Sequence, residues 1–212
     1  TWRFKSISGR IGWIIHIIVK FSLPEMVSSG TVVLLDSDVF FTRNFSNKDL
    51  DIVSNDKILI KNQPKTESGT HRRHMERSRK TLAVDPGSTD YHYMSTPDIW
   101  YPEYVKELQN HLEMLYEKPW QEALFEIGDI SSSTLYGVFV EEVLKPELLR
   151  VRSPLPYFIA WDQSSYDEFL RHPKECCADK LTAVIQSNIN SSVNDYIKIV
   201  EQNFFNQKPN NQ

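Results

Sequence analysis

The feature that most constrains this fold is a short apolar run followed at once by two acids. The run, Val32 to Leu35, lies between Gly30 and the sequence Asp36-Ser37-Asp38. An uninterrupted apolar run of this length, bounded by glycine and by polar residues, is typical of a buried strand in an α/β sheet. Ligands of open α/β sheets bind beyond the carboxyl ends of the strands, which is where Asp36 and Asp38 fall. We therefore expect a binding site at this strand end.

Two carboxylates separated by one small residue can share a hard divalent cation. Proteins commonly hold Mg²⁺ or Mn²⁺ with one or two carboxylates together with substrate phosphates. Asp36 and Asp38 are therefore candidate metal ligands, and through the metal they are candidates for binding a diphosphate. The residues alone leave a second interpretation open, in which two solvated acids simply begin a turn.

Composition narrows the class of protein. The chain has 212 residues with a net charge of −4, which disfavours a sequence-independent nucleic-acid binder. Its two cysteines, Cys176 and Cys177, are adjacent, so an unstrained disulfide between them is not expected and a reducing compartment is favoured. The apolar run Trp13 to Val19 is too short to span a membrane. We therefore expect a cytoplasmic protein, able to associate with the membrane periphery, that has no transmembrane segment and does not bind nucleic acid.

The hydrophobic pattern predicts a single α/β domain over residues 1–205, followed by a polar tail at 206–212. Residues 12–22 are apolar nearly all round, which predicts a helix buried inside the domain. The polar stretch 63–80 shows no periodicity and is expected to be a surface loop. Short apolar runs between turn signals predict further strands at 57–61, 82–84, 91–94, 157–161 and 181–186. Apolar periodicity and helix-end signals predict further helices after Pro102, at 120–127, from Leu135 to before Pro146, at 163–171 and near the C-terminus. In the helix before Pro146, Glu141 and Glu142 are expected to face outward.

The strand and its acids, Leu34-Leu35-Asp36-Ser37-Asp38-Val39, resemble the D-x-D motif of glycosyltransferases with the GT-A fold. In that family the motif binds the metal that accompanies the diphosphate of a nucleotide-sugar. The resemblance implies a Rossmann-like mixed sheet flanked by helices. It also implies an enzyme that moves a sugar from a nucleotide-sugar to a hydroxyl of a glycan or lipid-linked acceptor, with Mn²⁺ or Mg²⁺ as cofactor.

Further blocks resemble a bacterial-type group of GT-A-like proteins, and together they span about Gly12 to Asn188. The matching blocks are Gly12-Trp13 with Lys20, Pro24-Glu25, Arg43-Asn44-Phe45, Ser133-Thr-Leu-Tyr-Gly137 and Ile185-Gln-Ser-Asn188. Two features differ from that group. Its glutamate before Thr-Leu-Tyr-Gly falls on Ser132, and the first strand of a GT-A fold has no counterpart ahead of Trp2.

The resemblance suggests roles for individual residues, each of which has a structural alternative. Lys20 could approach the diphosphate or simply extend from its helix to solvent, and Trp13 could stack on a base or sugar or lie in the core. His92 and Tyr136 could line the acceptor site or pack in the interior. Asp129 could deprotonate the acceptor hydroxyl in place of the missing glutamate, or cap a helix.

Two other functions remain open. A haloacid-dehalogenase-like phosphatase also has an apolar strand ending in Asp-x-Asp, with Asp36 as nucleophile and Asp38 as general acid. However, Val39 and Phe40 differ from the residues usual in that fold. A non-catalytic carbohydrate-binding protein would keep the fold without the base, which agrees with serine at position 132.

Overall fold

The computed structural model describes residues 11–28, 30–52, 56–63, 69–186, 189 and 193–205. The chain forms two compact units. The first unit comprises residues 1–34 and 55–154, and the second comprises residues 35–54 and 155–212. The chain therefore enters the second unit at Leu35, returns to the first, and enters the second again after Pro154.

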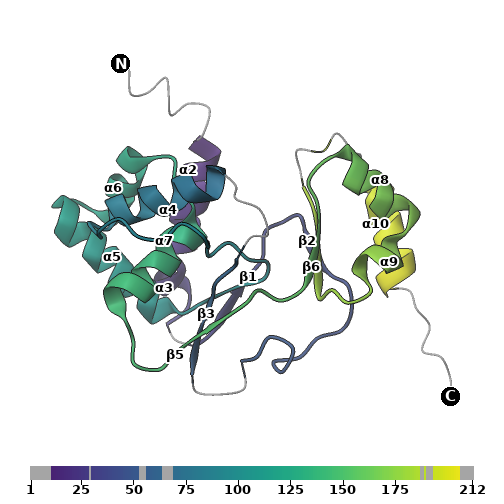
Figure 1. The fold of residues 1–212 in the computed structure, drawn as a ribbon, viewed down its shortest axis with the longest axis horizontal. Helices are drawn as coiled ribbons and strands as arrows, with labels where there is room; N and C mark the ends of the chain where they lie inside the picture. Colours follow the sequence, from purple (N-terminus) through teal and green to yellow (C-terminus); the bar gives the residue numbers. More distant parts are fainter. Residues whose placement is uncertain are drawn as a thin grey trace. The chain divides into compact units, whose positions relative to one another are not determined.

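The first unit consists mainly of helices, together with two small sheets (Figure 1). In one sheet β1 (Val32–Leu34) pairs antiparallel with β4 (Asp98–Trp100), and in the other β3 (Lys57–Ile60) pairs parallel with β5 (Leu149–Arg152). The helical elements are α2 (Ile11–Phe21), α3 (Leu23–Met26), α4 (Gly69–Thr81), α5 (Pro102–Tyr116), α6 (Trp120–Ile127), α7 (Ser132–Val138) and the π-helical segment η1 (Phe139–Leu144).

Stacked aromatic rings lie at the centre of this unit. The Trp100 ring of β4 is stacked between Phe21 of α2 and Tyr136 of α7, with ring centroids 5.4 and 4.5 Å apart. All three side chains are at most 2% exposed. Burial of such large rings is a main contribution to the stability of a core.

Helix α2 is buried on one face only, so the prediction of a helix enclosed on all sides was wrong. Ile14, Ile17 and Phe21 are buried, whereas Ile15 and Val19 are 54% and 51% exposed. The buried residues recur every three or four positions, as on a helix that packs against its neighbours along one side. Among the described residues, no helix is long and apolar enough to cross a membrane.

Helix α4 corrects the prediction of a surface loop over 63–80, of which residues 69–80 are helical. Its buried positions are His74, Met75, Ser78, Arg79 and Thr81, which have helical spacing but are mostly polar. A hydrophobicity pattern could not detect this face, because four of its five buried residues are polar. Arg79, the charged one, is buried together with its partner Glu142.

The strands predicted at 82–84 and 91–94 are also absent from the described residues. The first of these segments is a turn at the end of α4, and the second contributes only an isolated bridge between His92 and Asn62. In contrast, the prediction of helix α6 is confirmed from Trp120 to Ile127, preceded by Pro119 and ended by Gly128 at φ 76°. Glycine adopts this positive φ without steric cost.

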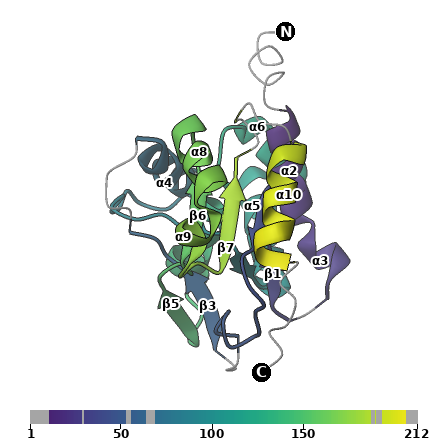
Figure 2. The ribbon, with the colours of Figure 1, turned by 90° about the vertical axis from the view of Figure 1, so that its right-hand side faces the viewer.

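The second unit is a three-stranded mixed sheet covered by helices (Figure 2). β7 (Thr182–Ile185) lies in the centre, antiparallel to β2 (Val39–Phe41) and parallel to β6 (Tyr157–Ala160). Phe40, Phe158 and Phe169 meet in its core. The helical elements are α8 (Gln163–Arg171), α9 (Pro173–Cys177), α10 (Val193–Val200) and the π-helical segment η2 (Glu201–Phe205).

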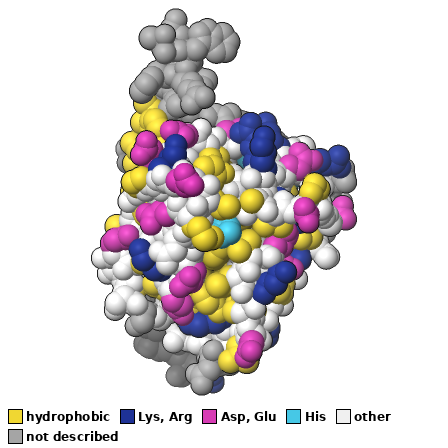
Figure 3. Space-filling view, turned by 90° about the vertical axis from the view of Figure 1, so that its left-hand side faces the viewer, with side chains coloured by type: hydrophobic (Ala, Val, Ile, Leu, Met, Phe, Trp, Pro, Cys, Tyr) yellow, Lys and Arg dark blue, Asp and Glu magenta, His cyan; other side chains and the backbone are white. Residues whose placement is uncertain are grey.

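The fold class is therefore mixed α/β, as expected, with the described strands distributed over three small sheets rather than one. Figure 3 shows the face of the molecule on the side where α5 and α6 lie in Figure 1. On that face acidic and basic side chains are interspersed with hydrophobic ones. No field of a single sign covers it.

Candidate functional site

The acids Asp36 and Asp38 lie in a tight turn between β1 and β2. The Val39 N–H donates to the Asp36 carbonyl at 3.2 Å, which closes the turn around Ser37 and Asp38. The Ile185 N–H donates to the Asp38 carbonyl at 3.0 Å and so ties the turn to the central strand β7. Asp36 and Ser37 are exposed, and Asp38 is half-buried. The turn therefore presents two carboxylates on a backbone that its own sheet holds in place.

This turn fits a metal only when the substrate supplies further ligands. Among the described residues, no group of three or more His, Cys, Asp or Glu side chains could hold a metal ion. Asp36 and Asp38 supply two carboxylates, which is the usual protein share of a Mg²⁺ site completed by substrate phosphates and water. A metal bound here would neutralise negative charge on a diphosphate leaving group.

The two helix α2 residues predicted to bind the nucleotide-sugar lie in the first unit. The Trp13 indole N–H donates to the Ile130 carbonyl at 2.8 Å, although the side chain remains 42% exposed. This bond fixes the ring against the loop before α7. Lys20 is half-buried. Burial raises the pKa of the Asp98 carboxyl group, and the positive charge of Lys20 partly offsets this rise.

Asp98 is a buried acid that the sequence reasoning missed. It is 7% exposed on β4 and is the strand partner of Leu34, the last residue of β1. One of its carboxylate oxygens accepts from the Ile99 N–H at 3.0 Å, while the buried Oδ2 has no hydrogen-bond partner among the described residues. Burial raises the pKa of Asp98 to about 6. The Asp-Ile-Trp sequence gives no signal of this environment, which arises from strand pairing.

Asp129, the predicted base, is held by arginines of α4. Its carboxylate lies 2.9 Å from Arg77 and 3.9 Å from Arg73, and its carbonyl accepts from Arg77 at 2.7 Å. These contacts fix the loop between α6 and α7 to α4. Both arginines contact Oδ2 of this carboxylate, so Asp129 takes part in ion pairs in this arrangement.

His92 lies in the interior of the first unit. It is 4% exposed, and its ring centroid is 3.9 Å from that of His71 on α4. Its Nδ1 accepts from the Met94 N–H at 3.1 Å, and its backbone pairs with Asn62. Burial, with a smaller effect from the charge on His71, lowers the pKa of His92 to about 4. The ring is therefore neutral at physiological pH and packs as a core residue.

Tyr136 and Gly137 of the Thr-Leu-Tyr-Gly block serve packing. The buried Tyr136 hydroxyl accepts from the Tyr101 N–H at 3.2 Å, and burial raises its pKa. A Cβ atom placed on Gly137 would lie only 2.0 Å from Cγ of Tyr93. Position 137 therefore requires glycine because the Tyr93 ring rests directly on the α7 backbone.

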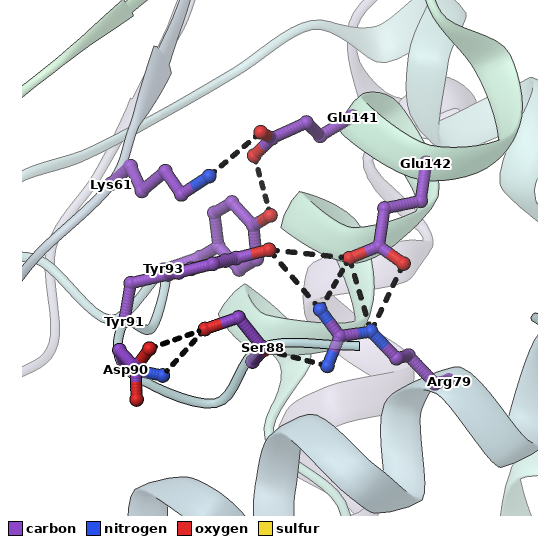
Figure 4. A network of polar contacts seen from close by, with 8 residues as sticks. All are labelled: Lys61, Arg79, Ser88, Asp90, Tyr91, Tyr93, Glu141 and Glu142. Carbon is purple, nitrogen blue, oxygen red and sulfur yellow. Dashed lines mark hydrogen bonds and ion pairs between the residues drawn. The ribbon is translucent and has the colours of Figure 1, made fainter. Parts of the chain in front are cut away.

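Glu141 and Glu142 form the clearest polar network of the first unit, so the prediction that they face outward was wrong (Figure 4). Glu141 accepts from the Lys61 ammonium at 2.7 Å and from the Tyr93 hydroxyl at 2.6 Å. Glu142 accepts from Arg79, with Nε at 3.0 Å and Nη2 at 2.7 Å. Both acids lie in the π-helical segment η1, a backbone form that is frequent at functional sites.

The two pairs in Figure 4 differ in exposure and geometry. Arg79 and Glu142 form a two-pronged pair whose side chains are 4% and 20% exposed. Lys61 and Glu141 form a single contact at 20% and 28% exposure, and the Lys61 ammonium also lies 3.5 Å from the centre of the Tyr91 ring. Adjacent acids in a sequence are usually solvated. No pattern in the sequence indicates that Arg79 of α4 and Lys61, the residue after β3, bind these two acids.

Comparisons with known proteins give one result. The model of a family of unknown function, DUF6492, matches residues 2–208. Neither the curated proteins nor the solved structures include a significant match to this chain.

Proposed function

The chain belongs to the DUF6492 family, and we propose that it is a metal-dependent glycosyltransferase with a GT-A-like fold. The observation that carries the proposal is the turn at Asp36-Ser37-Asp38. Two carboxylates, one exposed and one half-buried, follow a strand and lie in a turn closed by backbone hydrogen bonds. Such a turn suits a divalent cation shared with a diphosphate.

In this proposal Asp36 and Asp38 bind Mn²⁺ or Mg²⁺, and the metal binds the diphosphate of a nucleotide-sugar. When bound, the metal supplies positive charge that stabilises the departing diphosphate. The chain's own contribution is to hold the two carboxylates in place through the turn and through β7. The acceptor is a hydroxyl of a glycan or of a lipid-linked sugar.

The test is thermal unfolding of the full chain with Mn²⁺ and each common nucleoside diphosphate. A ligand at 100 times its dissociation constant stabilises the folded state by about 2.7 kcal/mol, which would raise Tm by several degrees. Asp38→Asn should abolish the rise. Asp179→Asn, which alters an exposed acid in a turn of the same unit, should leave it intact. If no nucleotide changes the melting curve with Mn²⁺ present, the proposal is wrong.

Turnover distinguishes an enzyme from a binding protein. An enzyme should hydrolyse the nucleotide-sugar slowly in the absence of an acceptor, and this hydrolysis should require Asp38. Nucleotide-dependent stabilisation without release of free sugar or diphosphate would instead favour a carbohydrate-binding protein. Ser132, at the position where the GT-A-like group that the sequence resembles has glutamate, is buried at the start of α7, and this serine favours the second function.

A further inference from the structure

The strands of the second unit bring a tryptophan to the edge of the sheet where the acids of the turn lie. β6 and β7 are parallel neighbours (Figure 2) and end together, at Ala160 and Ile185. β2 runs antiparallel to β7 and begins at Val39, directly after the acidic turn, Asp36-Ser37-Asp38. The acidic turn and Trp161, the first residue after β6, therefore share one edge of this sheet.

Backbone hydrogen bonds extend to this edge and set the spacing there. The Ile185 N–H donates to the Asp38 carbonyl at 3.0 Å. On the other side of β7, the Gln186 N–H donates to the Ala160 carbonyl at 3.3 Å. The sheet order β2-β7-β6 leaves one strand between the acidic turn and Trp161. Since neighbouring strands lie about 4.8 Å apart, the backbones at Asp38 and Trp161 are about 10 Å apart. An elongated ligand whose diphosphate is bound at the acidic turn can span this distance.

Trp161 is 58% exposed, whereas Trp100 and Trp120 are core residues at 0% and 3% exposure. The corner between β6 and α8 fixes its backbone, because its N–H donates to Ser165 Oγ at 3.1 Å and Asp162 caps the helix. Single exposed apolar residues are common on protein surfaces, so exposure alone assigns no role. The position of this ring, on the same sheet edge as the acidic turn, is what indicates a ligand.

An indole ring at this place suits the base of a nucleotide. Bases have flat π-faces that stack on aromatic side chains, and this stacking accepts any base because it uses no hydrogen-bond pattern. A nucleotide whose diphosphate shares a metal with the acidic turn extends away from it through its ribose and base. Among the described residues of this unit, the other exposed rings are Phe45, beyond the opposite end of β2, and Phe205, at the end of η2. Trp161 is therefore the ring best placed for the base.

We propose that Trp161 stacks on the base of the nucleotide that the acidic turn binds through a metal. This inference rests on the proposed function and adds the surface that holds the nucleoside. It moves this role from Trp13, the candidate from the sequence, to Trp161. Because stacking requires only a flat ring, Trp161 strengthens the binding of nucleotides in general and does not select one base over another.

The test is a calorimetric titration of the full chain, in the presence of Mn²⁺, with each common nucleoside diphosphate and with ribose 5-diphosphate. The last compound keeps the ribose and both phosphates and lacks only the base. At least one nucleoside diphosphate should bind at least fivefold more tightly than ribose 5-diphosphate. If neither kind of ligand binds, the proposed function and this inference both fail. If the two kinds bind equally, the metal site stands and the inference alone is overturned.

Variants at position 161 locate the stack. Trp161→Ala should weaken binding of the nucleoside diphosphate at least fivefold and change that of ribose 5-diphosphate less than twofold, because only the base contacts the indole. Trp161→Phe should keep most of the affinity, since a phenyl ring also stacks. Phe205→Ala, which removes a ring of 60% exposure from the same unit, should change neither.

Two results with these variants would overturn the proposal. Equal losses for both ligands in Trp161→Ala would show that the ring has only a structural role. A selective loss of nucleotide binding in Trp13→Ala, with Trp161→Ala unchanged, would show that the base stacks on the other tryptophan.

Discussion

The contact between Gly137 and Tyr93 predicts that Gly137→Ala is strongly destabilising, although alanine is the better helix former. The added Cβ would lie 2.0, 2.3 and 2.5 Å from Cγ, Cδ1 and Cδ2 of Tyr93, whereas ordinary contact begins at 3.4 Å. The ring must therefore move by at least about 1.4 Å. Tyr93 is 1% exposed, and its hydroxyl donates to Glu141 at 2.6 Å, so it cannot move without disturbing both its packing and that bond.

Three contributions set how much Gly137→Ala lowers the free energy of unfolding. Overpacking of a filled core costs about 1–3 kcal/mol. Loss of the hydrogen bond from Tyr93 to the charged Glu141 costs about 1.5–3 kcal/mol. Replacement of glycine by alanine in a helix returns up to about 1 kcal/mol. The net loss should be about 2–5 kcal/mol, which for a chain of this length lowers Tm by roughly 5–15 °C.

The assay is urea and thermal unfolding, with two controls. Gly12→Ala in α2 makes the same chemical change where the new Cβ would have nothing within 4 Å, so it should be neutral or slightly stabilising. In a Tyr93→Ala background the obstacle is gone, and Gly137→Ala should become neutral or stabilising by up to about 1 kcal/mol. The reasoning is refuted if Gly137→Ala matches the parent, or if it costs as much without the Tyr93 ring as with it.

The remaining predictions concern the buried charges and histidines. Arg79→Met should lower the free energy of unfolding, measured with urea, by about 3–5 kcal/mol, because it leaves the Glu142 carboxylate without its cation. Adding Glu142→Met should recover much of this stability, since the unpaired charge is then removed. If the losses of the two single variants simply add in the double variant, the pairing account is wrong. The pKa of His92 is about 4 in the fold, below its ordinary 6.5, so the neutral ring is the stable form. The buried neutral His92 therefore contributes fully to the free energy of unfolding above pH 6.5. This stabilisation is lost as the pH falls towards 4, by roughly 3 kcal/mol in total. His92→Gln should flatten the dependence of unfolding free energy on pH in this window, and an unchanged slope would show that His92 does not cause it.

Tertiary contacts decide the surroundings of three candidate site residues. For His92 and Tyr136 the sequence left open an acceptor site or the interior, and both side chains are buried. Asp129 was a candidate base or helix cap, and its carboxylate forms ion pairs with Arg77 and Arg73. Apart from Met94, which bonds to His92, their partners lie far away along the chain, so no local pattern could reveal them.

Local signals alone determined several elements. Pro119 and Gly128 bound α6 because proline suits a helix start and glycine tolerates a positive φ at its end. Asp162 caps α8, where its side chain accepts from the Ser165 N–H at 2.9 Å. The apolar runs of β3, β6 and β7 are strands, because three or four consecutive apolar residues between turn signals suit a half-buried or buried sheet position.

Only the tertiary structure decided the character of α4 and of the two adjacent glutamates. The buried face of α4 includes His74, Ser78 and Arg79, which are polar in the sequence. Arg79 is buried because Glu142 of η1 neutralises it through a two-pronged pair across 63 positions. The sequence determines whether a stretch is apolar and where it stops. Whether a charged side chain lies in solvent or inside the protein depends on its partner, and the fold alone brings that partner near.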